Sequence, residues 1–276
     1  MDMHTNLKLR MVAAATVLFG FYLVLAGAAI AVWGEGIWPL LTVATLGFVG
    51  FQYVLGKKMA LWSIGARDLD QSTSEGARIH QAVERLSREM EIDKPRVMVA
   101  EMGVPNAFAV GRKGAGVVVL STEIIQLLDR DELDGVIAHE LSHIRNRDVV
   151  MMVIGQSIAS MIGMAVYFVT VMGNRNIGAM LVGWMLSMLA QTLVMIFVLA
   201  ISRYREYVAD ADAAEAIGRG EPLARALEKL DRSSDGVHVD ERVNALCIHG
   251  GDRALLERIF STHPPTEKRV QRLRRY

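Results

Sequence analysis

The hydrophobic residues of this chain are gathered into four long runs that contain no Asp, Glu, Lys or Arg. The runs are residues 11–33, 37–56, 149–173 and 176–202. Each run is long enough to cross a hydrocarbon core about 30 Å thick as a helix, which takes about 20 residues. Backbone polar groups in lipid must be paired within the segment, so this pattern predicts four transmembrane helices.

The four runs occur as two pairs. Residues 34–36 separate the first two runs and residues 174–175 separate the last two, so each pair is expected to form a transmembrane helical hairpin. One alternative for the first run is a cleaved signal peptide, although its 23 residues exceed the usual signal core of about 7–15. For the last two runs, a buried helical hairpin in a soluble core stays open as an alternative.

Basic residues lie at the same ends of all four predicted spans, whereas the opposite ends carry only Glu35 and Arg175. By the positive-inside rule, the N-terminus, the central segment and the C-terminal segment are expected to be cytoplasmic. The chain is thus expected to be a multi-pass protein of the plasma (inner) membrane. The basic residues are Lys8, Arg10, Lys57, Lys58, Arg67, Arg145, Arg147, Arg203 and Arg205.

The segments outside the runs have the pattern of a globular protein. Short β-branched stretches at 96–102 and 115–120 predict strands, with 106–111 as a third. Apolar residues at helical spacing predict helices at 74–91, 131–148 (leading directly into the third run), 203–217, 222–232, 253–260 and 265–275. We therefore expect an α+β, predominantly α fold, with hairpins at 1–60 and 149–202 and a domain formed from 61–148 and 203–276.

Charge and cysteine content narrow the kinds of site that the chain can form. It has 30 basic and 30 acidic residues, a balance that argues against nucleic acid as a partner. Cys247 is the one cysteine, which excludes an intrachain disulfide and a metal site built from several cysteines. The cysteine content therefore favours histidines and carboxylates as the ligands of any metal site.

One motif for metal chemistry lies in the predicted 131–148 helix. His139 and His143 are four residues apart, so they project from the same helical face and can share a metal ion. Glu140 lies between them and can act as general base on a water molecule activated by the metal. Two surface histidines on a solvated helix are the alternative, but the small and apolar residues 135–138 favour a partly buried face.

A hydrolytic zinc site usually has three protein ligands, so a third must come from elsewhere in the chain. Glu206 is the best candidate, because a helical hairpin brings its two ends together and Glu206 follows the fourth run as the histidines precede the third. Asp210 shares its helical face and can orient one histidine through the spare ring N–H. The alternative is that Glu206 and Asp210 are ordinary members of a charged helix.

These motifs resemble the HtpX family of membrane zinc metallopeptidases and, more distantly, the CAAX prenyl endopeptidases. The resemblance rests on residues 139–148 and 202–210, on the Pro-Asn-Ala-Phe-Ala segment at 105–109 and on Thr-His-Pro-Pro-Thr at 262–266. It implies a gluzincin-like catalytic domain with one Zn²⁺ ion per chain, bound by His139, His143 and Glu206. It also implies that Glu140 is the general base and that Asp210 contacts a metal ligand without binding the metal itself.

Two further roles are expected with alternatives left open. His263 is a candidate donor to the oxyanion, with Arg203 as a weaker one; His263 is equally well explained as a residue that precedes a helix. Asn106, Ala107 and Phe108 are expected to belong to an edge strand beside the site, where an extended substrate can add by backbone hydrogen bonds. The alternative is a plain loop and strand of the sheet.

The sequence thus predicts a membrane-anchored zinc endopeptidase that cleaves protein substrates at the cytoplasmic surface of the bilayer. The resemblance implies quality control of misfolded or damaged membrane proteins. A protease that cuts within the bilayer is disfavoured, because each charge that flanks the motif would cost about 2.5–3.5 kcal/mol in lipid. A transporter or scaffold with a structural metal is the alternative of another class; the absence of ionisable residues within the runs argues against it.

Overall fold

The computed structural model of the chain describes residues 34–172, 176–234 and 264–276, with isolated positions before residue 34. The helix expected at 253–260 lies outside the described residues, and so does the first uncharged run apart from isolated positions. The chain divides into two compact units, residues 1–56 with 151–202 and residues 57–150 with 203–276. The helices are η1 (Glu35–Ile37), α2 (Trp38–Ser63), α3 (Ser74–Glu89), α4 (Thr122–Leu127), α5 (Arg130–Arg145), α6 (Asp148–Val171), α7 (Ile177–Ile217), α8 (Glu221–Ser234) and α11 (Thr266–Leu273).

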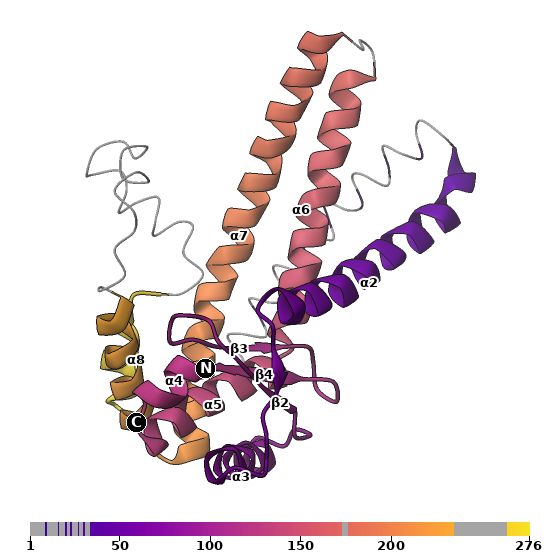
Figure 1. Cartoon of the computed structure of the whole chain (residues 1–276). Helices are drawn as coiled ribbons and strands as arrows, with labels where there is room; N and C mark the ends of the chain where they lie inside the picture. The colour runs from indigo at the N-terminus through magenta and orange to yellow at the C-terminus, as the bar shows by residue number, and fades with distance from the viewer. Residues whose placement is uncertain are drawn as a thin grey trace. The chain divides into compact units, whose positions relative to one another are not determined.

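Helices α6 and α7 supply most of the first unit. They run side by side (Figure 1), with Ala159 and Ile162 of α6 packed against Val194 and Val198 of α7. Both helices are long and apolar enough to cross a membrane, and only 28% and 18% of their most apolar windows are buried. A core helix of a soluble protein would be mostly buried, so these helices fit a lipid environment.

Helix α2 contributes its first part to the same unit and carries the second uncharged run. Many of its apolar side chains are exposed, Val43 and Leu46 among them. The Ser157 hydroxyl of α6 donates a hydrogen bond to the Gln52 side chain of α2, and such polar pairs hold helices together where water is absent.

The second unit contains a four-stranded sheet in the order β1 (Arg67–Asp68), β2 (Arg96–Ala100), β4 (Val117–Ser121), β3 (Ala107–Val110). Strand β2 pairs parallel with β4, and the two outer pairs are antiparallel. Successive residues of a strand face opposite sides of the sheet. Val118 and Leu120 accordingly pack into the main helical core, whereas Val117 and Val119 pack on the other face. Strand β4 is therefore buried throughout, and β3 is an edge strand.

Helix α5, which carries the two motif histidines, is fixed at the centre of this unit. A capping box between Asp129 and Glu132 starts it, and one face of apolar residues, Leu133, Ile137 and Leu141 among them, is fully buried. Gly135 permits a close approach to α8, since a Cβ atom there would lie 2.9 Å from the backbone nitrogen of Leu223. The helix also contacts α3 and β3, so the motif is held on several sides.

The expected continuous helix from 131 into the third run is wrong at one point. Helix α5 ends at Arg145, and α6 begins anew at Asp148. Arg147 between them has φ of 56°, a left-handed conformation that costs a residue with a Cβ atom about 1–2 kcal/mol. Helix α7, by contrast, runs unbroken past the fourth run to Ile217, as the sequence predicts. The expectation of a predominantly helical α+β fold is confirmed.

Candidate functional site

The two motif histidines and Glu206 converge in the second unit. The Nε2 atoms of His139 and His143 lie 3.2 Å apart. Glu206 Oε1 lies 3.4 Å from His143 Nε2, and Oε2 lies 3.5 Å from His139 Nε2. Zinc–nitrogen bonds of about 2.0–2.1 Å in a tetrahedral site place neighbouring donors roughly 3.4 Å apart. The three donors therefore fit one metal ion, with a fourth position left for a water molecule or substrate.

The charges around the histidines also fit a divalent cation. With both histidines neutral, as binding to a metal requires, the four carboxylates and two guanidinium groups that surround the pair, all of them at most 8% exposed, leave an excess of two negative charges. Uncompensated charge is costly in a protein interior, so this excess favours a bound dication. The carboxylates belong to Glu140, Asp148, Glu206 and Asp210, and the guanidinium groups to Arg205 and Arg269.

Asp210 contacts His139 on the Nδ1 side of its ring, and Arg269 contacts Asp210. Asp210 Oδ1 is 3.1 Å from His139 Nδ1, and the Arg269 guanidinium donates two hydrogen bonds to Asp210, of 2.6 and 2.9 Å. Arg269 also lies 3.4 Å from Glu206 Oε2. Burial alone would raise the pKa of Asp210, but the bonds from Arg269 and His139 outweigh it and hold that pKa below its ordinary value.

His139 keeps a proton when no metal is bound. Burial lowers its pKa, but the carboxylates of Asp210 and Glu206 outweigh burial and raise the pKa to about 10. A metal ion that binds His139 must displace this proton, as metal ions do when they bind imidazole.

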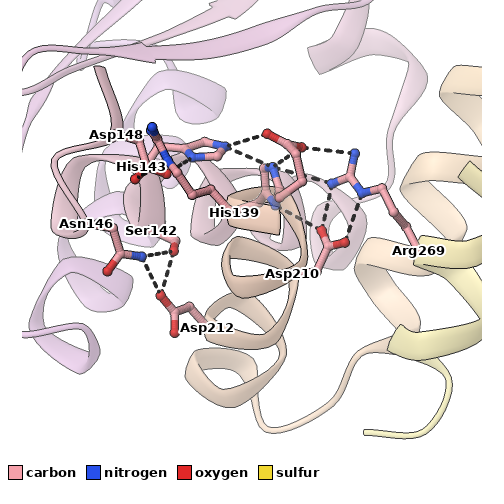
Figure 2. A network of polar contacts seen from close by, with 10 residues as sticks. His139, Ser142, His143, Asn146, Asp148, Asp210, Asp212 and Arg269 are labelled. Carbon is pink, nitrogen blue, oxygen red and sulfur yellow. Dashed lines mark hydrogen bonds and ion pairs between the residues drawn. The ribbon is translucent and has the colours of Figure 1, made fainter. Parts of the chain in front are cut away.

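Asp148 and Arg205 lie behind the second histidine. His143 Nδ1 donates a hydrogen bond of 2.7 Å to Asp148 Oδ2, and Arg205 Nε lies 2.7 Å from Asp148 Oδ1. Both histidines thus turn Nε2 towards the centre of the site and Nδ1 towards a buried aspartate. Figure 2 shows Asp148 on one side of the histidine pair and Asp210 with Arg269 on the other.

Sequence reasoning missed Asp148, Arg205 and Arg269. Asp148 follows His143 by five residues, beyond the helical spacings that bring side chains together. Arg205 was interpreted only as a basic residue that sets membrane orientation. The burial of Arg269 could have been predicted from the sequence. It lies four residues before Leu273 and shares the apolar face of α11 with Val270.

A second polar network fixes α5 against α7 (Figure 2). The Ser142 hydroxyl and the Asn146 amide of the α5 end both donate hydrogen bonds to Asp212 of α7, of 2.6 and 3.0 Å. Asp212 is fully buried, so this contact holds the helix with the histidines in one register against the helix with Glu206.

The other expected residues lie as follows. Glu140 is buried on α5 between the histidines, and its negative charge favours the charged form of the Arg269 guanidinium. Ala107 and Phe108 belong to edge strand β3, and Asn106 precedes it. The Asn106 N–H donates to the Ser121 hydroxyl, and its carbonyl accepts from the Ser121 N–H. His263 lies outside the described residues.

Comparison with known proteins agrees with this site. The model of peptidase family M48 matches residues 73–276. The chain is 50% identical to a protease HtpX homolog of Halobacterium salinarum, over 96% of this chain and all of that protein. It is 38% identical to a protease HtpX homolog of Aquifex aeolicus, over 85% of this chain and 82% of that one.

A solved structure shares the fold. The crystal structure of S. mikatae Ste24p matches 99% of this chain with a TM-score of 0.57 and 17% sequence identity, and the match spans 66% of that longer chain. At this identity the likeness concerns the fold alone. The family match and the identities to the HtpX homologs establish that the chain belongs to peptidase family M48, and it is a metalloprotease.

Proposed function

We propose that this metalloprotease is a zinc-dependent endopeptidase, anchored in the plasma membrane, that hydrolyses peptide bonds of membrane proteins at the cytoplasmic surface. The observation that carries the proposal is the convergence of two histidine Nε2 atoms and one Glu206 carboxylate beside the buried Glu140. Two imidazoles and one carboxylate are one of the donor sets found in catalytic zinc sites, including those of zinc proteases. The order of these residues along the chain is that of the HtpX family, whose role in quality control we extend to this chain.

The residues of the chain have separate tasks in this reaction. Zinc held by His139, His143 and Glu206 would supply Lewis acidity, which lowers the pKa of water and polarises the scissile carbonyl. Glu140 accepts the proton of the attacking water and delivers it to the leaving amine. His263 is our candidate donor to the developing oxyanion, and Arg203 is the second candidate.

The site residues are proposed to lie in one catalytic domain formed from 61–148 and 203–276, with hairpins at 1–60 and 149–202. Orientation follows from the basic residues at one side of the spans. A cysteine at position 174, in a chain where Cys247 is replaced by Ser, is expected to react with a membrane-impermeant maleimide added outside intact cells. Labelling of position 174 only after cell lysis would contradict the proposed topology.

Edge strand β3 is the proposed binding site for an extended substrate. Asn106 pairs with Ser121 through its own backbone carbonyl, and the register places Phe108 opposite Val119. Hydrogen-bonded and outward-facing residues alternate in an antiparallel ladder. The N–H and C=O groups of Ala107 and Ala109 therefore point to the open edge, and β3 contacts α5.

Proline at position 107 tests this role, because proline on an edge strand removes only an outward N–H group. Ala107→Pro is expected to raise KM for a peptide substrate about tenfold, the cost of one lost hydrogen bond of roughly 1.4 kcal/mol, with little change in kcat. Phe108→Pro is the matched control, since it removes a bond within the sheet and is expected to lower Tm. An unchanged KM in Ala107→Pro would exclude β3 as the substrate strand.

Removal and return of the metal test the proposed function itself. The full chain, purified in detergent with a chelator, is expected to lose cleavage of casein and to regain it when about one equivalent of Zn²⁺ is added. Full activity of a chain shown to be free of metal, or no activity after zinc is bound, would exclude the proposal. Mn²⁺ and Co²⁺ added in parallel would show which ion supports the highest rate.

A further inference from the structure

Each histidine of the site contacts an aspartate, and each of these aspartates contacts an arginine. From His143, the contacts run to Asp148 at 2.7 Å and on to Arg205 at 2.7 Å. From His139, they run to Asp210 at 3.1 Å and on to Arg269 through two hydrogen bonds. The two sets have the same order of contacts, although Arg205 and Asp210 both belong to α7 whereas Asp148 begins α6 and Arg269 lies on α11. Figure 2 shows His143 with Asp148 and, on the other side, His139 with Asp210 and Arg269.

Charge compensation explains why an arginine completes each set. Asp148 is 3% exposed and Arg205 is 5% exposed. A buried charge is costly unless a group of opposite charge lies beside it. Arg205 Nε lies 2.7 Å from Asp148 Oδ1 and compensates this carboxylate, whose other oxygen accepts the hydrogen bond from His143 Nδ1. The lone pair of His143 Nε2 is then directed to the centre of the site.

The break between α5 and α6 is what brings Asp148 to His143. In a continuous helix, a residue five positions on would lie about 140° around the axis from His143. The helix instead ends at Arg145, and Arg147 takes the left-handed conformation before α6 starts at Asp148. Unfavourable backbone conformations persist where the surrounding structure requires them, often at functional sites. Here the unfavourable residue turns the chain so that Asp148 faces back to the motif.

We propose that Asp148 and Arg205 are positioning residues of the metal site, which act through His143 as Asp210 and Arg269 act through His139. This inference rests on the proposed function, because it requires that His143 binds a metal ion. It assigns a role to Asp148, the first residue of α6, and to Arg205 of α7, which contact each other.

Zinc affinity measured on the full chain in detergent tests the proposal. The variants are Asp148→Asn, Arg205→Met and both together, and the zinc dissociation constant is measured by competition with a chromophoric chelator. Each single change is expected to weaken zinc binding by about 10- to 100-fold, the usual effect of losing a partner of a metal-bound histidine. If Arg205 acts through Asp148, the double variant is expected to lose no more than Asp148→Asn alone.

The matched control is Arg85→Met. Arg85 forms an ion pair of 2.5 Å with Asp134, so it also links an arginine to α5, but away from the metal site. Its zinc affinity is expected to stay within about twofold of the parent chain. If Asp148→Asn does not fold, Asp148→Glu, which keeps the charge and displaces it by one methylene, replaces it with the same expected loss of affinity.

Two results would overturn the proposal. A variant that lowers the Tm of the metal-free chain and leaves zinc affinity within twofold of the parent would make Asp148 and Arg205 structural only. Losses that add in the double variant would show that Arg205 does not act through Asp148. The parent chain separates this failure from that of the proposed function, since a parent that binds no zinc, or is inactive with zinc bound, refutes the function itself.

Discussion

Replacing Glu140 by Gln is expected to lower kcat for peptide hydrolysis by about 100- to 10,000-fold, the usual contribution of a general base. Glutamine has nearly the same shape, but it cannot take a proton from the attacking water. Zinc affinity is expected to fall far less than kcat, because the ligand atoms belong to His139, His143 and Glu206 and only one surrounding negative charge is lost. The measurements are kcat and KM on casein-derived peptides, together with zinc content.

The control for this change is Glu132→Gln. Glu132 is another buried glutamate of α5, but it accepts the Asp129 N–H and pairs with Lys229 at 2.7 Å, away from the histidines. Its loss of charge is expected to lower Tm and to leave kcat nearly unchanged. If Glu140→Gln keeps more than a tenth of the parental kcat, Glu140 is not the general base.

Replacing Glu206 by Ala is expected to weaken zinc binding by more than about 100-fold, the upper range for residues that only support a ligand. The change removes one of three proposed donors and one of the negative charges that balance the dication. Stabilisation by zinc is expected to shrink as well, because a ligand at 100 times its dissociation constant contributes about 2.7 kcal/mol to unfolding free energy. Zinc content and the rise of Tm on zinc addition are measured together.

The matched control is Glu215→Ala, on the exposed side of the same helix. It is expected to leave both zinc content and the zinc-dependent rise of Tm unchanged. Undiminished zinc in Glu206→Ala would remove Glu206 from the ligand set and leave two histidines, which alone do not make a site of this class.

Local patterns predicted most of the elements near the site. Short runs of β-branched residues predicted β2 and β4, and the fourth run with the charged helical sequence after it predicted the unbroken α7. The pattern failed at residues 146–147, where polar residues are compatible with a helix but the chain turns. A helical period cannot detect this break, because the gain from it comes from contacts that Asp148 makes in the folded protein with His143 and with Arg205, which lies on a different helix.

The sequence likewise did not show which arginines pair with the buried aspartates. The C-terminal segment has five basic residues between Lys268 and Arg275, and only Arg269 is buried. The other four basic residues have similar chemistry to Arg269, and they differ from it because they lie on the exposed side of the segment. Arg205 shows the same limit, since a basic residue at the end of a span has the same composition whether it faces headgroups or a buried aspartate.

By itself, the sequence determined which chemistry was available: long uncharged runs for lipid, and two histidines at helical spacing with a glutamate between them. It also selected Glu206 and Asp210, because a helix of known period carries both on one face. Only the tertiary structure decided how the site is held, through the turn at Arg147, the pair Asp148–Arg205 and the distant Arg269. Periodicity is a local property of the chain, whereas the compensation of buried charge depends on which residues meet in the folded protein.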